Sequence, residues 1–315
     1  MVGKSAVSPN IPRSTVREAL GPKVQFDRPL APLTSYRTGG PAKYFIPAGT
    51  PEELTAAVTA ANRLRIPFFI IGGGSNLLVS DRGYDGLIIR VEIRGMNLVD
   101  ETVVTCGAGE DLMALVNFAA ECSLTGLEFA AGIWGTVGGA LYGNAGAYGG
   151  EMKDIVRRVT LVDSAGYGKT VDNEYCRFGY RDSCFKVTGD IIIEATFQLR
   201  KGDKVAIGSR VDEILALRAR RHPGEGNSAG CFFKNIPDPD QEHGKLPAGR
   251  LLEEAGVKGL SVGGAAVYPD HANIIVNTGH ATSKDIRDLA DIMKEKVREK
   301  FAILLEEEVI QLGEF

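Results

Sequence analysis

Two glycine-rich stretches in this sequence could bind a phosphate group through backbone amides. Residues 132–150 (GIWGTVGGALYGNAGAYGG) contain eight glycines and no charged side chain. Each glycine costs a helix about 1 kcal/mol relative to alanine, so the composition predicts no regular helix here. Within this stretch, Gly135–Gly139 could present successive amide N–H groups to an anion, as backbone nests do for phosphate. The alternative interpretation is a glycine-rich hairpin packed on its own domain.

The second stretch, residues 72–76 (GGGSN), follows a short apolar run at 66–71 that we expect to be a buried strand. No long helix starts on these glycines, because residues 77–79 continue apolar and residues 81–83 turn again. A Rossmann fingerprint needs strand, G-x-G-x-x-G and helix in one unit, so this loop is a different kind of site. Residues 103–110 contain only G-x-G, and acidic residues at the start of the following helix would repel a pyrophosphate.

Composition and charge exclude several classes of protein. The chain has 315 residues, 44% of them hydrophobic and 24% charged, which is typical of a globular protein of two or three packed units. A net charge of −4 argues against a general nucleic-acid binder. No apolar run or leader pattern indicates a membrane segment or secretion, so we expect a cytoplasmic protein. The five cysteines show no C-x-x-C and no Cys/His cluster, which predicts neither disulfides nor a metal site.

Periodicity predicts where the regular elements lie. We expect the first twenty residues to be a flexible arm and the capping-box pattern at residues 50–53 to start a helix of about four turns. Strands are expected in the region 155–199, one of them at residues 180–183. A helix ending near Pro223 follows a domain boundary at about residue 205. The last expected helix runs from Ser283 to about Phe301.

With both glycine stretches placed, the chain resembles the UDP-N-acetylenolpyruvoylglucosamine reductase (MurB) family, in its shorter second subtype. No single block suffices, but the matching blocks follow one another in order over nearly the whole chain. They are Leu33–Gly40, Ile71–Leu78, Gly132–Gly149, Tyr180–Ser183, Ser228–Asn235 and Leu305–Val309.

The resemblance implies an α+β fold, with a PCMH-type two-part FAD-binding module followed by a smaller α/β substrate-binding domain. It implies FAD-binding subdomains at residues 21–90 and 91–205, a substrate domain at 206–304, and a C-terminal segment, 305–315, that returns to the active site. The FAD would be non-covalent, and NADPH would be the co-substrate. The residues that the resemblance implies for FAD binding are Gly72, Gly73, Gly74, Ser75, Asn76, Leu77, Gly135, Thr136, Val137, Gly138, Gly139 and Asn144.

The reaction that the resemblance implies is reduction of the enolpyruvyl ether of UDP-N-acetylglucosamine to UDP-N-acetylmuramate. This step supplies peptidoglycan precursors and therefore cell-wall synthesis, cell shape and division. Negative charge develops on the enolate, so the site must supply cations and a proton donor. By resemblance, Arg181 and Glu308 polarise the carboxylate end and Cys231 donates the proton. Without the family, Arg181 would be interpreted as a strand-edge ion pair and Glu308 as one solvated residue of three glutamates.

Cys231 departs from the family, whose better-known members carry serine there. A cysteine thiol ordinarily has a pKa near 8.5 and gives up its proton more readily than an aliphatic hydroxyl, so the donor role survives the exchange. The alternative is a small buried hydrophobic residue. Trp134, Glu307 and Ile310 depart as well, and Ile310 receives no role. The residues implied on the substrate side are Tyr180, Lys234 and Asn235; Arg218, Arg220 and Arg221 meet either a ligand phosphate or solvent.

Two other functions remain open at this point. One is a PCMH-fold FAD-dependent oxidase of the vanillyl-alcohol oxidase group, which often tethers flavin through histidine. None of the four histidines, at 222, 243, 271 and 280, lies in a flavin-loop block. The other is a non-catalytic nucleotide-sugar binding module, against which the pattern at 181, 231 and 308 argues. We expect a monomer that binds small molecules and neither nucleic acid nor membrane.

Overall fold

The computed structural model of the protein describes residues 9–224, 227–241 and 244–315, and the chain divides into two compact units. The first unit comprises the chain up to Arg28 together with Ala42–Gly73 and Asp85–Leu217. The second comprises Pro29–Pro41, Gly74–Tyr84 and Arg218–Phe315. In the described ranges, no helix is both long and apolar enough to cross a membrane.

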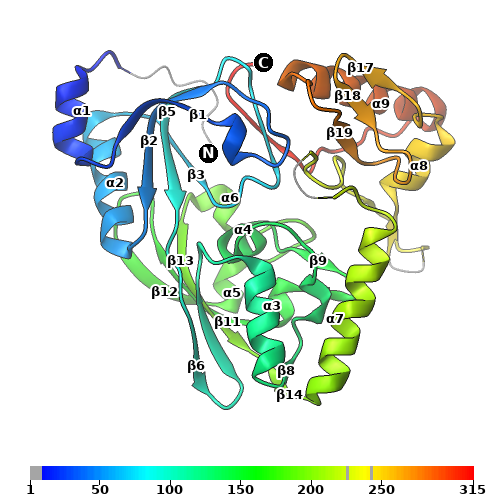
Figure 1. Cartoon of the computed structure of the whole chain (residues 1–315), viewed down its shortest axis with the longest axis horizontal. Helices are drawn as coiled ribbons and strands as arrows, with labels where there is room; N and C mark the ends of the chain where they lie inside the picture. The colour runs from blue at the N-terminus through cyan, green and yellow to red at the C-terminus, as the bar shows by residue number, and fades with distance from the viewer. Residues whose placement is uncertain (1–8, 225–226, 242–243) are drawn as a thin grey trace. The chain divides into compact units, whose positions relative to one another are not determined.

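The first unit opens with a four-stranded sheet of order β1-β2-β5-β3, in which β3 and β5 are parallel. Its helix α2 begins as predicted, because Thr50 Oγ1 accepts from the Glu53 N–H and Pro51 occupies the first position. α2 buries one apolar face, whereas its other face is polar. In chain order, the elements up to residue 91 are α1 Arg13–Leu20, β1 Gln25–Pro29, η1 Ala31–Leu33, β2 Pro41–Ala48, α2 Pro51–Leu64, β3 Phe68–Ile71, β4 Leu77–Val79 and β5 Tyr84–Val91 (Figure 1). Of these, η1 and β4 belong to the second unit.

The expectation of a flexible arm through residue 20 is wrong for residues 13–20, which form α1. Val16 and Leu20 lie one turn apart and are both buried in the core of the first unit. The guanidinium groups of Arg13 and Arg17 lie 5.0 and 5.4 Å from the Phe26 ring centroid. Two apolar residues and two cation–π contacts therefore hold a helix that weak periodicity did not reveal. Residues 1–8 lie outside the described residues.

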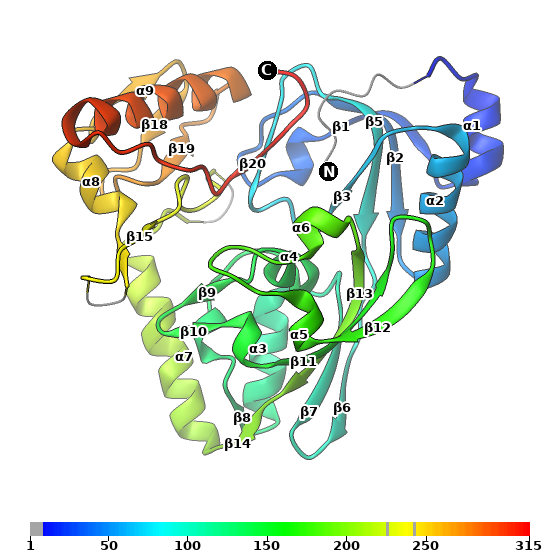
Figure 2. The same ribbon diagram turned by 180° about the vertical axis from the view of Figure 1, so that it is seen from behind.

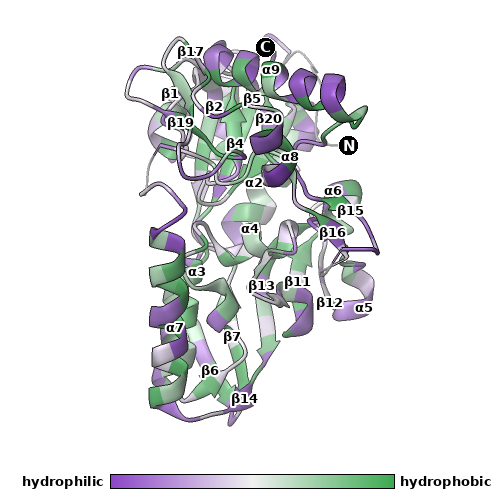
Figure 3. Ribbon diagram, turned by 90° about the vertical axis from the view of Figure 1, so that its right-hand side faces the viewer, coloured by the Kyte–Doolittle hydropathy of each residue, from purple (hydrophilic) through white to green (hydrophobic). Residues whose placement is uncertain are grey.

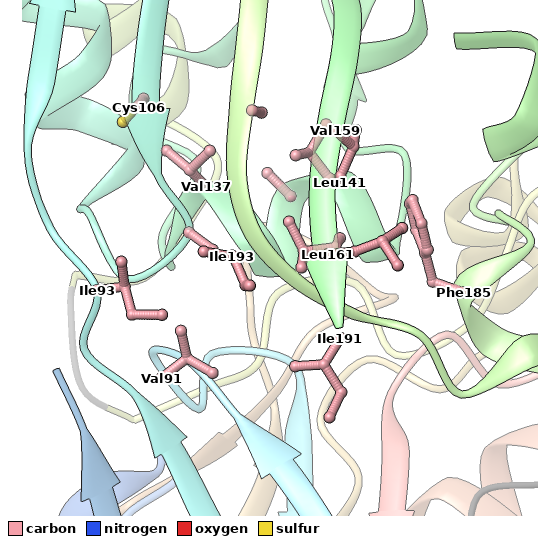
Figure 4. Close-up of a cluster of buried hydrophobic side chains, with 14 of the residues drawn as sticks. Val91, Ile93, Cys106, Val137, Leu141, Val159, Leu161, Phe185, Ile191 and Ile193 are labelled. Carbon is pink, nitrogen blue, oxygen red and sulfur yellow. The ribbon is translucent and has the colours of Figure 1, made fainter. Parts of the chain in front are cut away.

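A five-stranded antiparallel sheet of order β12-β11-β13-β7-β6 forms the rest of the first unit. Figure 2 shows its strands with α5 following β12. Its core side chains interdigitate with those of α4 (Figure 4). The elements are β6 Met96–Asp100, β7 Val103–Gly107, α3 Leu112–Glu121, β8 Leu124–Thr125, η2 Glu128–Ala130, α4 Val137–Tyr142, β9 Gly146–Ala147, β10 Gly150–Glu151, η3 Met152–Asp154, β11 Val156–Val162, β12 Gly168–Asp172, α5 Asn173–Cys176, α6 Phe185–Thr188, β13 Ile191–Gln198 and β14 Arg200–Lys201.

Helix α7, Lys204–Ala219, crosses the predicted boundary at residue 205, and the first unit extends to Leu217. Its buried residues are Ile207, Val211 and Ile214, at helical spacing on one face. Figure 3 shows hydrophobic and hydrophilic residues alternating along this helix. The helix packs against the first unit. The boundary between the two units therefore lies at the C-terminal end of α7 rather than at its start.

The second unit is built on a three-stranded antiparallel sheet, β17-β18-β19, on which α9 packs. The α9 helix matches its prediction, because Thr282 and Asp285 form a reciprocal capping box. The C-terminal strand β20 pairs in parallel with β4. The elements are β15 Ile236–Pro237, β16 Lys245–Leu246, α8 Ala248–Glu254, β17 Ser261–Val262, β18 Ala265–Val267, β19 Ile275–Asn277, α9 Ser283–Phe301 and β20 Ile310–Leu312.

Candidate functional site

The two glycine-rich stretches touch each other in the first unit. A Cβ at Gly72 would lie 2.3 Å from Thr136 Oγ1, and a Cβ at Gly73 would lie 3.0 Å from Gly135 Cα. Such distances leave no room for a side chain at either glycine, so the two stretches pack directly against each other. The sequence predicted that both stretches serve one ligand, and the structure brings Gly72 and Gly73 together with Gly135 and Thr136.

The prediction that residues 132–150 form no helix is wrong, because α4 occupies 137–142. The glycine penalty is outweighed by tertiary contacts: Val137, Ala140 and Leu141 are buried in the core, and Thr136 Oγ1 accepts from the Gly139 N–H at the helix start. A Cβ at Gly138 would lie 3.0 Å from the Ala108 Cβ.

Three of the amides that were expected to form a phosphate nest are already bonded within the protein. The Val137 N–H donates to Glu110 O at 2.9 Å and the Gly138 N–H donates to Ala108 O at 2.8 Å. The Gly139 N–H makes the cap bond to Thr136 described above. In the part of the chain that the structure describes, the N–H groups of Gly135 and Thr136 have no protein acceptor. The backbone N–H groups that could bind an anion at this turn are therefore those of Gly135 and Thr136, at its start, and not those of residues 137–139.

The second half of the 72–77 loop belongs to the second unit and holds its C-terminal segment. Gly74 has φ +63°, and a Cβ there would lie 2.0 Å from Leu33 O, so glycine is required for packing. Ser75 O accepts from the Ser35 hydroxyl at 3.3 Å. Asn76 Nδ2 donates to Glu308 O at 3.0 Å, and Asn76 O accepts from the Ile310 N–H at 3.1 Å.

Leu77 is buried in β4 and pairs with Ile310. Its side chain is therefore largely withdrawn from solvent.

Arg181 lies in a tight turn and not in the strand that was predicted for residues 180–183. The Gly179 N–H donates to Asp182 O at 3.0 Å, and the Asp182 N–H donates to Gly179 O at 3.2 Å. Arg181 has φ +52°, a region that residues with a side chain seldom adopt and that is often found at functional sites. Its Nη2 donates to Gly146 O at 2.9 Å, and its guanidinium lies 5.5 Å from the ring of Tyr180.

Cys231 and Glu308 lie on adjacent segments of the second unit. Cys231 forms an isolated bridge with Ile274, and two residues later Phe233 bridges Glu307. The Glu308 N–H donates to Phe232 O at 2.8 Å. The 305–315 segment thus lies beside the segment that carries Cys231.

The three consecutive glutamates have different surroundings. Glu306 is exposed and pairs with Lys234. Glu307 forms an ion pair with Lys294 at 2.9 Å and accepts from Gln311 at 2.6 Å. Glu308 is half-buried. The interpretation of Glu308 as one of three solvated residues therefore does not describe its environment.

Lys234 and Asn235, predicted on the substrate side, both contact the protein. Besides its ion pair, Lys234 donates its N–H to Glu306 O at 2.8 Å. Asn235 Oδ1 accepts from the Ala248 N–H at 3.1 Å.

Two residues near Cys231 were not singled out from the sequence. Tyr36 is fully buried, and burial, together with the nearby Cys231 thiol, raises the pKa of its phenol. Asn273 is also buried; its Oδ1 accepts from the Phe233 N–H at 2.9 Å and its Nδ2 donates to Phe233 O at 2.8 Å. The only sequence feature that could have drawn attention to Tyr36 is its place in the matching block Leu33–Gly40. Asn273 lies in no matching block, so nothing in the sequence was a reason to select it.

Comparison with known protein families gives two matches along the chain. Residues 42–172 match the family described as FAD binding domain, which contains the contact between the two glycine stretches. Residues 222–312 match the family described as UDP-N-acetylenolpyruvoylglucosamine reductase, C-terminal domain. The second match contains Cys231 and Glu308.

Individual relatives match over almost the whole chain. The UDP-N-acetylenolpyruvoylglucosamine reductase of Lachnoclostridium phytofermentans is 39% identical over 297 residues, which are 93% of this chain and 94% of the relative. That of Lactiplantibacillus plantarum is 39% identical, with coverages of 93% and 94%. The crystal structure of UDP-N-acetylenolpyruvylglucosamine reductase from Thermus caldophilus has a TM-score of 0.77 and 34% identity, and covers 92% of this chain and 98% of its own.

Proposed function

The chain belongs to the UDP-N-acetylenolpyruvoylglucosamine reductase family, and we propose that Arg181, Cys231 and Glu308 carry out its reaction. The protein is a flavin-dependent oxidoreductase of peptidoglycan synthesis. It reduces the enolpyruvyl ether of UDP-N-acetylglucosamine to UDP-N-acetylmuramate, with FAD as cofactor and NADPH as reductant. The oxidase and the non-catalytic binding module are set aside by the family assignment.

The glycine contact fits the diphosphate of FAD. Gly72 and Gly73 pack against Gly135 and Thr136 with no room for a side chain between them, so an anion bound beside this contact would meet backbone that it can approach closely. The N–H groups of Gly135 and Thr136, with the Thr136 hydroxyl, are the donors that we propose for the phosphates. Val137, Gly138 and Gly139 support this turn through the fold of α4. When bound, FAD carries an electron pair from NADPH to the enolpyruvyl double bond.

Each of the three proposed catalytic residues has a role set by the negative charge that develops on the substrate during the reaction. As the electron pair and a hydrogen enter at the terminal vinyl carbon, negative charge moves to the neighbouring carbon and the carboxylate. The guanidinium of Arg181 is the permanent cation that stabilises this charge. Cys231 Sγ–H then gives its proton to the neighbouring carbon, which completes the saturated ether. Glu308, in its protonated form, orients the carboxylate end of the substrate by donating a hydrogen bond to it.

The nucleotide end of the substrate calls for donors outside the catalytic trio. We propose that Tyr180, Lys234 and Asn235 meet the diphosphate or the uridine, since the first flanks Arg181 and the others follow Cys231. We also propose that the protein acts as a monomer in the cytoplasm, where NADPH and UDP-sugars are available. Light scattering of the purified protein tests the oligomeric state.

The observation that carries this proposal is the approach of Gly72 and Gly73 to Gly135 and Thr136 inside a chain of this family. Purified protein should absorb near 450 nm and release its flavin on acid precipitation. Under anaerobic conditions NADPH should bleach the absorbance, and the enolpyruvyl UDP-sugar should restore it. An oxidase would recover its colour with oxygen but not with the sugar, and flavin that stays with the precipitate would contradict non-covalent binding.

A further inference from the structure

The turn that carries Arg181 is held at both ends by side chains that the reaction does not use. At its start, Asn144 Nδ2 donates to Gly179 O at 2.8 Å. At its end, Lys186 Nζ donates to the carbonyl oxygen of Arg181 itself. The adjoining Ser183 hydroxyl donates to Tyr142 O at 2.7 Å. These contacts all lie within the first unit.

Asn144 is fully engaged by the protein. It is buried at 0% exposure, and its Nδ2 also donates to Glu151 Oε2 at 2.8 Å. Its Oδ1 accepts from the Lys153 N–H at 3.0 Å. Both amide hydrogens are therefore used, which favours a role in holding the turn over the cofactor contact that the sequence predicted.

Lys186 places its ammonium group on the Arg181 carbonyl. Its Nζ lies 3.9 Å from Asp182 Oδ1 and 5.8 Å from the centroid of the Tyr142 ring. Its side chain is only 27% exposed. An ammonium held by a carbonyl, a carboxylate and a ring face is fixed in place more firmly than a surface lysine.

Such fixing matters because the backbone of Arg181 is strained. A residue with a Cβ at φ +52° lies in a disfavoured backbone region and persists there only when its surroundings hold it. A hydrogen bond to the Arg181 carbonyl stabilises the peptide orientation that this φ requires. The position of the guanidinium therefore depends on Lys186.

We propose that Lys186 is a positioning residue for the catalytic arginine, holding Arg181 in its left-handed turn with Asn144 at the other end. This inference rests on the proposed role of Arg181. On this proposal, removal of Lys186 acts only through Arg181.

The variants Lys186→Met and Lys186→Arg test this inference in the flavin-loaded, full-length protein. Single-turnover reoxidation by the enolpyruvyl sugar should slow about 10- to 100-fold in Lys186→Met, since small misplacement of a catalytic group costs about this much. Bleaching by NADPH should be unchanged, and Lys186→Arg should recover most of the rate. Lys201→Met, which removes an exposed lysine paired with Glu101 at 3.1 Å, is the control and should behave as wild type.

A double-mutant cycle with Arg181→Ala separates positioning from direct action. Arg181→Ala alone should slow reoxidation about 10²- to 10³-fold, and adding Lys186→Met should cause no further loss. Further slowing in the double variant would overturn the inference, as would a wild-type rate in Lys186→Met. A wild-type rate in Arg181→Ala would instead overturn the proposed catalytic role of Arg181.

Hydrogen exchange gives a readout that does not depend on activity. In Lys186→Met the amides of Gly179 and Asp182, which close the turn, should exchange faster than in wild type, while those of α3 should not change. Unchanged exchange at both closing amides would contradict the role of Lys186 in holding the turn.

Discussion

Replacing Gly72 with alanine should disturb the contact between the two glycine stretches by an amount that the structure allows us to estimate. The new Cβ would lie 2.3 Å from Thr136 Oγ1, and 3.4 Å from both Thr136 Cβ and Cγ2. The threonine has to rotate away and so loses its cap bond to the Gly139 N–H, which is worth about 1 kcal/mol. Residual overpacking adds about 1–2 kcal/mol. The free energy of unfolding should fall by about 2–3 kcal/mol.

The same geometry predicts that Thr136→Ala rescues Gly72→Ala. Thr136→Ala removes Oγ1 and Cγ2, so the nearest remaining atom is Thr136 Cβ, at an ordinary contact distance of 3.4 Å. Thr136→Ala alone should cost about 1 kcal/mol as a lost cap. In that background Gly72→Ala should cost less than about 0.5 kcal/mol, which gives a coupling of about 2 kcal/mol.

Urea unfolding followed by circular dichroism measures all four proteins of this cycle, and the ratio of absorbance at 450 to 280 nm measures flavin content. Gly72→Ala should bind less FAD per folded chain than wild type. Gly168→Ala is the control, since a Cβ there meets no atom within 4 Å. Additive effects of the two substitutions, or full flavin content in Gly72→Ala, would refute the claim that this contact forms the cofactor site.

Two further substitutions test the packing and the electrostatics. Gly138→Val should lower the melting temperature through overpacking on Ala108, at about 1–3 kcal/mol, rather than only remove flavin; an unchanged melt would contradict this. Burial, followed by the charge of Arg218, lowers the pKa of His222 to about 4. Between pH 6.5 and 4 the unfolded chain therefore binds a proton that the folded chain does not, so stability falls as the pH drops through this window. His222→Gln should reduce that fall by about 1–2 kcal/mol between pH 7.5 and 5 in urea unfolding, and an unchanged pH dependence would exclude His222 as its source.

The elements that the sequence predicted well are those with local signals. Helices α2 and α9 carry their own capping residues and apolar faces, so nothing distant is needed to place them. The helix α4 was missed because its stability comes from Val137 and Leu141 packing in the core, which overrides the glycine penalty. The turn at Arg181 was missed for a related reason: its conformation is held by residues as distant along the chain as Asn144.

In the candidate site, too, the features with a local sequence signal were predicted, whereas those set by tertiary contacts were not. Glycine composition located the two loops, but only the structure shows which amides are already bonded within the protein, such as that of Gly138. It also separates Gly74, a packing glycine, from Gly72, which borders the proposed cofactor site. His243, one of the four histidines considered for flavin attachment, lies outside the described residues. The burial of Tyr36 and the bond from Lys186 to the Arg181 carbonyl are not visible in the periodicity of the sequence.

The central claim is that Cys231 donates the proton that completes reduction of the substrate, and single-turnover kinetics of Cys231→Ala test it most directly. The variant should be bleached by NADPH at the wild-type rate, because no proton at the substrate carbon is needed in that step. Its reoxidation by the enolpyruvyl sugar should be about 10²- to 10⁴-fold slower, and Cys231→Ser should recover a substantial part of the rate. Reoxidation of Cys231→Ala at the wild-type rate would show that the thiol only packs and that the proton comes from another group.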